Sequence, residues 1–181
     1  ACGGDALFRV STFNQVGGYK GALIAGEEPE LCFRLRQKGW AVFRLDEEMT
    51  LHDAAMTRFS QWWNRAKRAG YAYAEGGYLH GGSAEKYKVK QVLSILLWSV
   101  FLPVIIVFLS LFSSVLLFLF AIYPLQVVRL MLKNRLNVKS YRGAFYYAMS
   151  NVVGKFPQLI GMVRFTFNKW QGRRGTLIEY K

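Results

Sequence analysis

The chain has 181 residues, enough for one domain, with 52% hydrophobic residues and a formal net charge of +13. Such apolarity combined with such positive charge argues against a soluble basic protein and favours a membrane protein. The two cysteines, Cys2 and Cys32, exclude a disulfide framework, and neither belongs to a Cys-x-x-Cys pair.

The first segment, residues 2–9, opens on a Gly-rich turn at Gly3, Gly4 and Asp5 and leads into an expected strand and a short helix. A second glycine pair follows between Val16 and Tyr19. Glycines let the backbone adopt positive φ or come close to a ligand, although turns alone account for most such pairs.

The next stretch carries the strongest chemical signal. Pro29 suits the first turn of a helix and Gly39 the residue after its end, so we expect a helix over residues 29–38. Glu27 and Glu28 then sit at its N-terminus, where the macrodipole and unpaired N–H groups favour ionised carboxylates. This position suits a general base, and it also suits ordinary helix capping.

After residues 40–45, whose composition predicts a strand, a helix is expected over residues 54–69. Asp53 suits its N-cap. One face of this helix carries four side chains that can bind a pyrophosphate or simply form a solvated basic face: Arg58, Gln61, Arg65 and Arg68.

These segments together resemble membrane-bound bacterial family 2 glycosyltransferases. In that family a Gly-rich turn and a Val-Gly-Gly-Phe/Tyr segment precede an acidic motif, Glu-Asp-x-(Asp/Glu)-Leu, and an Arg-Leu-x-x-x-Gly-Trp-like segment. Residues 2–9, 16–19 and 27–40 match these features, with Glu27 and Glu28 in place of Glu and Asp. Residues 61–70 occupy the place of the Gln-x-x-Arg-Trp motif of processive members but have a different spacing, which argues against synthesis of a long polymer.

The resemblance implies the GT-A fold, an α/β fold in which a nucleotide-binding half with an Asp-x-Asp metal motif precedes an acceptor-binding half. The chain contains no Asp-x-Asp, so we expect the C-terminal part of a longer enzyme, with residues 1–85 as the acceptor side of its catalytic domain. Glu28, or Glu27 beside it, would then be the base, and the turn at Gly3, Gly4 and Asp5 would approach the substrates.

The same resemblance implies a divalent metal, Mg²⁺ or Mn²⁺, held mostly by the nucleotide-binding half. His52 is the candidate ligand from this chain, although it equally suits a hydrogen bond within the fold. Trp62 is a candidate to stack on a sugar, or else to fill the core. A zinc site made of Cys2, Cys32, His52 and His80 is a weaker alternative, because their spacing matches no known zinc pattern.

No charged residue occurs from Gln91 to Val128, a run of about 38 positions. One helix of that length would measure about 57 Å, nearly twice a hydrocarbon core of about 30 Å. We therefore expect a transmembrane hairpin within residues 86–132, with crossings at 92–111 and 114–132; a re-entrant or interfacial pair remains the alternative. Basic residues flank both ends and favour a cytoplasmic location for both: Lys86, Lys88, Lys90, Arg129, Lys133, Arg135 and Lys139.

The tail, residues 133–181, combines ten Lys and Arg residues with a single acidic residue, Glu179. Its apolar and aromatic residues recur at helical intervals that Gly154 and Pro157 interrupt. We expect interfacial helices that contact anionic headgroups or a lipid pyrophosphate, and not nucleic acid.

The expected activity is transfer of a sugar, with inversion, from a nucleoside diphosphate sugar to a lipid-linked or cell-envelope glycan acceptor. Its expected location is the cytoplasmic face of the bacterial inner membrane. The alternative is a non-catalytic, membrane-anchored interaction module. In that case the paired glutamates only cap a helix, and the basic tail binds anionic lipid or a partner subunit.

Overall fold

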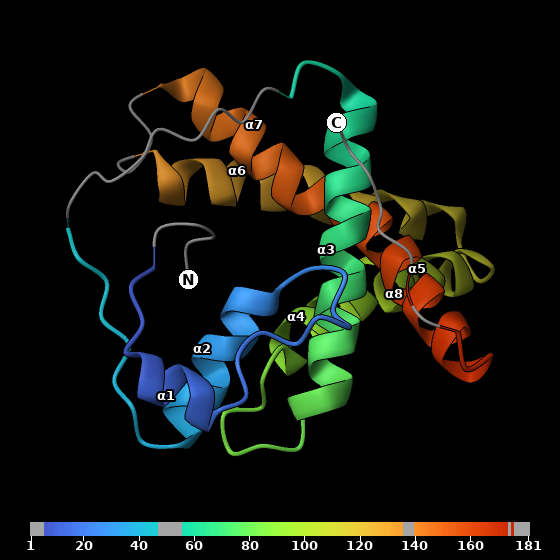
Figure 1. Ribbon diagram of the computed structural model, residues 1–181. Helices are drawn as coiled ribbons and strands as arrows, with labels where there is room; N and C mark the ends of the chain where they lie inside the picture. The colour runs from blue at the N-terminus through green and yellow to red at the C-terminus, as the bar shows by residue number, and fades with distance from the viewer. Residues whose placement is uncertain (1–5, 47–55, 136–139, 174, 176–181) are drawn as a thin grey trace.

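The computed structural model describes residues 6–46, 56–135, 140–173 and 175, and all regular structure in them is helical (Figure 1). The N-terminal part holds α1 (Val10–Gln15), α2 (Glu27–Gln37) and the long α3 (Phe59–His80). The apolar part holds α4 (Val89–Leu96), the π-helical η1 (Leu97–Phe101), α5 (Leu102–Ser110), the 3₁₀-helical η2 (Ser114–Ala121) and α6 (Ile122–Asn134). The tail forms α7 (Tyr141–Val153) and α8 (Lys155–Trp170).

The expected α/β fold, the acceptor-side part of a GT-A domain, is wrong, because no described residue lies in a strand. Residues 6–9 and 40–45 are irregular, and 84% of Phe43 is exposed. Trp40 instead donates from Nε1 to Gln15 Oε1 at 2.8 Å, and the guanidinium of Arg9 lies 5.8 Å from its ring. A strand is stabilised by hydrogen bonds and side-chain pairs with a neighbouring strand, and no described segment supplies one.

Helix α3 lies at the centre of the molecule, and α8 crosses it at close range (Figure 1). A Cβ atom on Gly161 of α8 would lie 1.9 Å from the carbonyl O of Lys67, and one on Gly70 would lie 2.0 Å from that of Gln158. The two helix backbones therefore touch where these glycines meet them. Around the crossing packs a small core of Ile24, Tyr71, Ala74 and Phe165.

The expected helix at 54–69 corresponds to α3, which begins at Phe59 and continues to His80. The expected end at residue 69 is therefore wrong. In the structure Gly70 is buried inside α3, at the crossing with α8. A glycine at this position allows the close contact between the two helix backbones.

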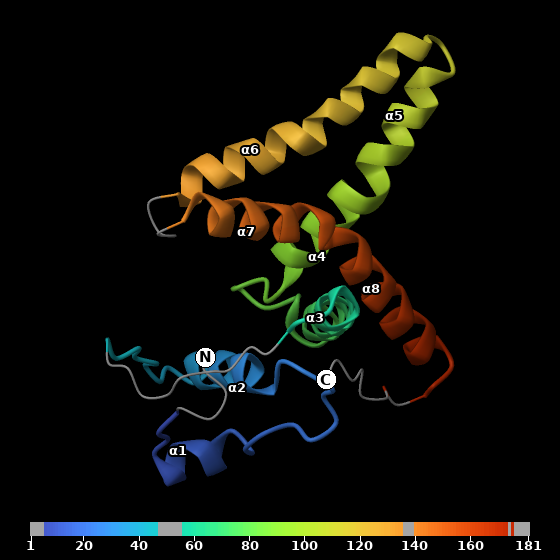
Figure 2. The same cartoon turned by 90° about the horizontal axis from the view of Figure 1, so that it is seen from above.

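Two apolar rods form a hairpin that projects from the rest of the molecule (Figure 2). The first, Val89–Ser110, comprises α4, η1 and α5, and the second, Ser114–Asn134, comprises η2 and α6. Both are long and apolar enough to cross a membrane, and only 11% and 6% of their most apolar stretches are buried within the protein. Tyr123 joins the rods by donating its hydroxyl to the carbonyl O of Trp98 at 2.6 Å. The two expected segments, 92–111 and 114–132, are confirmed as long apolar helices.

The tail is helical, as its apolar periodicity predicts, and the helix break falls at Gly154. Pro157 lies in the first turn of α8, where a missing N–H costs little. Helix α7 packs on α6 through Val127, Ala148 and Val152. On the far side of α3 from the hairpin lie α1 and α2, and α2 carries the acidic motif (Figure 2).

Candidate functional site

Glu30 lies in the first turn of α2 and is buried, with 1% of its surface exposed. Its carboxylate accepts hydrogen bonds from Arg34 Nε at 2.9 Å and His80 Nε2 at 2.7 Å, and Lys20 Nζ lies 2.9 Å away. Burial by itself raises the pKa of a carboxyl, but these partners outweigh it and lower the pKa of Glu30 below its ordinary value of 4.5. Glu30 therefore joins the loop before α2, α2 itself and the end of α3.

Arg34 extends this connection to the second glycine pair. It donates from Nη1 to the carbonyl O of Val16 and from Nη2 to that of Gly18 at 2.6 Å. Gly17 and Gly18 have φ values of 76° and 63°, which a residue with a side chain adopts only with strain. A Cβ atom on Gly18 would also lie 2.9 Å from Phe13 Cε1. The Val-Gly-Gly segment and the arginine of the Arg-Leu segment are thus parts of one hydrogen-bonded unit.

The acid pair, Glu27 and Glu28, forms the first two residues of α2, after Gly26 with its φ of 81°. Both glutamates are half-buried. Burial, followed by the negative charge of Glu28, raises the pKa of Tyr19 above its ordinary value of 10.0, so the Tyr19 hydroxyl lies in the field of the acid pair. A carboxylate held at the start of a helix in this way can accept a proton from a bound hydroxyl group.

A groove of about 310 Å³ runs between the start of α2 and α3. Its volume falls within the range of ligand-binding pockets, about 300–1,000 Å³. Gly26, directly before α2, and Pro29 in its first turn flank the acid pair in the sequence and line this basic groove, and Arg65 and Arg68 line it from α3. Two of the arginines expected to bind a diphosphate therefore share a hollow with the end of the helix that carries the acid pair.

Lys88, the residue directly before α4, also lines the basic groove. Its Nζ lies 5.3 Å from the ring centroid of Tyr73 and 5.1 Å from that of Tyr87. Burial lowers the pKa of Lys88 below its ordinary value of 10.5. In the sequence Lys88 was only a basic flank of the apolar segment. No local signal indicates its place in the groove, because Tyr73 belongs to α3, fifteen positions earlier.

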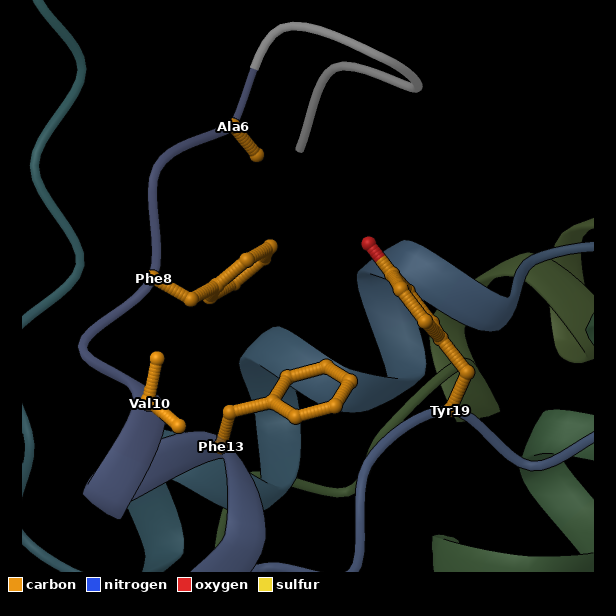
Figure 3. A pocket seen from close by; sticks show the side chains of 5 residues that line it. All are labelled: Ala6, Phe8, Val10, Phe13 and Tyr19. Atoms are coloured by element: carbon orange, nitrogen blue, oxygen red, sulfur yellow. The ribbon is translucent and has the colours of Figure 1, made fainter.

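A second, aromatic hollow of about 400 Å³ is lined by Ala6, Phe8, Val10, Phe13 and Tyr19 (Figure 3). The rings of Phe13 and Tyr19 meet edge to face with centroids 5.5 Å apart, and the ring of Phe8 lies 5.7 Å from that of Phe13. The hollow is thus lined mainly by the aromatic rings of Phe8, Phe13 and Tyr19.

The expected pyrophosphate-binding face of α3 divides into two parts. Arg65 and Arg68 reach the basic groove. Gln61 Oε1 accepts hydrogen bonds from the backbone N–H groups of Thr57 and Arg58, both at 2.9 Å, and so caps the start of α3. Arg58 is the N-cap residue and is exposed.

Trp62, a candidate for stacking on a sugar, lies in an aromatic cluster at the start of α3. Its ring centroid is 5.2 Å from that of Phe59 and 6.4 Å from that of Trp63. Its Cζ2 atom would lie 3.7 Å from a Cβ atom on Gly154, between α7 and α8. These contacts favour packing, the other role that the sequence left open for Trp62.

Four expected site residues lie outside the described residues: Gly3, Gly4, Asp5 and His52. Within the ranges that the structure describes, no three or more His, Cys, Asp or Glu side chains are grouped so that they could hold a metal ion. Of the alternative zinc set, Cys32 is a buried free thiol and His80 is bound to Glu30, while Cys2 and His52 are not described. The divalent metal stays a prediction from the resemblance.

Comparison of the chain with protein-family models, with curated proteins and with solved structures found no match. The resemblance to family 2 glycosyltransferases therefore rests on the motif residues alone.

Proposed function

We propose that the chain is the acceptor-binding part of a membrane-bound glycosyltransferase that uses a nucleoside diphosphate sugar. The observation that carries the proposal is the basic groove, which Gly26 and Pro29, on either side of Glu27 and Glu28 in the sequence, line together with Arg65 and Arg68 of α3. Sugar transfer needs both kinds of group, because the acceptor loses a proton while negative charge develops on the departing diphosphate.

In the proposed reaction, the acceptor hydroxyl oxygen attacks the anomeric carbon of the donor sugar. The bond between that carbon and the diphosphate oxygen breaks, and the diphosphate leaves with the bonding electron pair. Glu28, or Glu27 beside it, takes the proton of the hydroxyl. Attack from the face opposite the leaving group inverts the anomeric configuration. Arg65 and Arg68 can form charge-assisted hydrogen bonds to the phosphate oxygens as negative charge develops on them.

The proposed location is the cytoplasmic face of a bacterial inner membrane. The two apolar rods can form a transmembrane hairpin, and the basic residues at both of its ends favour the cytoplasmic side for each. The exposed aromatic side chains of α7 and α8, with their neighbouring basic residues, suit the headgroup region. An enzyme held there would act on a lipid-linked acceptor or on a cell-envelope glycan.

The test is sugar transfer by membranes that contain the natural full-length protein, with a panel of UDP-, GDP- and dTDP-sugars and with Mg²⁺ or Mn²⁺. The wild type is compared with a Glu27→Gln/Glu28→Gln double variant. Glu85→Gln is the matched control, since Glu85 is exposed and pairs with Arg36. We expect transfer by the wild type and by the control, and its loss in the double variant.

Undiminished transfer by the double variant would remove the acid pair from the reaction. Absence of transfer by the wild type with every donor would favour the non-catalytic interaction module.

A further inference from the structure

Lys88 has no carboxylate partner among the described residues. Its neighbours in the sequence, Tyr87 and Val89, carry no negative charge, and its Nζ lies close to the rings of Tyr73 and Tyr87. The carboxylate that lines the same groove, Glu30, is already held by Lys20, Arg34 and His80. A half-buried ammonium group in this setting favours an anion from outside the chain, because an unpaired buried charge is costly.

A glycine in α3 and an unusual backbone conformation determine the position of the Lys88 side chain. A Cβ atom on Gly76 of α3 would lie 2.9 Å from Tyr87 Cε1 and 3.1 Å from Lys88 Cγ, so a glycine at this position makes room for both side chains. The backbone of Lys88 has a φ of 60°, which a residue with a side chain seldom adopts. A lysine at a helix end that only extended toward the lipid headgroups would require neither the neighbouring glycine nor the positive φ.

Lys88 also has a defined place relative to the apolar hairpin. It directly precedes the rod Val89–Ser110, which is long and apolar enough to cross a membrane. If that rod crosses a bilayer, Lys88 would lie at the end of the crossing, near the level of the lipid phosphates. Tyrosine rings such as those of Tyr73 and Tyr87 are well suited to this depth.

We propose that Lys88 binds a phosphate group carried by a membrane lipid, at the edge of the basic groove next to the bilayer. The inference rests on the proposed function and deepens it, since this phosphate would belong to the lipid-linked acceptor. Arg65 and Arg68 line the same groove and remain the contacts for the donor diphosphate. The acceptor would thus be held by its charged group, with its hydroxyl near the acid pair.

The test measures binding of dihexanoyl phosphatidic acid, dihexanoyl phosphatidylcholine, inorganic phosphate and UDP to the natural full-length protein in neutral detergent. Wild type is compared with Lys88→Gln and with Lys90→Gln, which changes an exposed lysine two positions away. We expect phosphatidic acid to bind more tightly than the zwitterionic lipid and inorganic phosphate. We expect Lys88→Gln to weaken that binding about tenfold or more, as for a lost charged hydrogen bond, and to leave UDP binding unchanged. Lys90→Gln should bind like the wild type.

A second measurement needs no variant. Phosphatidic acid should protect Lys88 of the wild type from an amine-reactive reagent, while UDP should not. Equal weakening by both lysine variants, or protection of Lys88 by UDP alone, would overturn the inference; the second result would assign Lys88 to the donor diphosphate. Lipid binding that depends on Lys88 in a protein without transfer activity would sustain the phosphate site and refute the proposed function.

Discussion

At Glu30, one side chain joins three segments that are far apart in the sequence. Its partners are Lys20 in a loop, Arg34 in the same helix and His80 at the end of α3. Taking a carboxylate out of water is costly, and several hydrogen bonds from charged partners are needed to offset that cost. The arrangement makes Glu30 a residue that positions the acid pair, because it fixes the start of α2 against α3.

Replacing Glu30 by Gln should lower the free energy of unfolding by about 3–5 kcal/mol, because it leaves buried positive charge without its partner. Glu85→Gln, which breaks an exposed pair with Arg36, should have a much smaller effect. Denaturant unfolding in detergent measures both. Equal, small losses for the two variants would show that Glu30 does not hold α2 against α3.

A fall in pH should weaken the contacts of Glu30 with Lys20, Arg34 and His80. Folding lowers the pKa of Glu30, so its ionised form stabilises the native state fully above the unfolded value near 4.5. As the pH falls through the lower folded value, the unfolded state binds more protons and the free energy of unfolding decreases. The thermal midpoint of the wild type should therefore fall more between about pH 5 and pH 3 than that of Glu30→Gln. Parallel curves for the two proteins would contradict this account.

Among the helices, the crossing of α3 and α8 depends on glycine. Gly161→Ala would place a methyl group 1.9 Å from the carbonyl O of Lys67 and should destabilise the fold by about 1–3 kcal/mol or more, as overpacking does. Gly77→Ala is the matched control, since its nearest neighbour would be Val92 Cγ2 at 3.4 Å. Alanine there should be neutral or stabilise α3 by up to about 1 kcal/mol. Thermal unfolding that ranked the two variants alike would argue against a close crossing.

Helical periodicity and runs without charge predicted the helices that depend on local sequence, including both apolar rods and the tail. The strand expected at residues 40–45 was wrong because strand formation depends on a partner, which local composition does not report. Spacing along one helix face predicts that Arg65 and Arg68 lie together, and both line the same groove; their role in binding a diphosphate stays a prediction. Glu30 and Lys88 were missed, since their roles come from contacts between segments that are distant in the sequence.

For the whole molecule, the proposed transmembrane hairpin would decide how the site meets the membrane. The first rod has 22 residues, and so spans about 33 Å at 1.5 Å per residue, close to a hydrocarbon core of about 30 Å. In spheroplasts, Ser113→Cys at the hairpin tip should react with a membrane-impermeant maleimide added outside. Lys133→Cys should react only after permeabilisation, and the chain without added cysteines gives the background. A tip that is protected from outside would indicate a re-entrant hairpin.

The central claim is that the acid pair of α2 and the arginines of α3 serve one reaction. Steady-state kinetics of sugar transfer by the natural full-length protein test it most directly, with wild type, Glu28→Gln and Arg65→Gln measured on the same donor and acceptor. We expect Glu28→Gln to lower kcat by about 10²- to 10⁴-fold with little change in the KM of the donor, as for loss of a general base. Arg65→Gln should raise the KM of the donor or lower kcat/KM about tenfold or more, as for loss of a charged hydrogen bond to phosphate. Rates and KM values within twofold of the wild type for both variants would contradict the account.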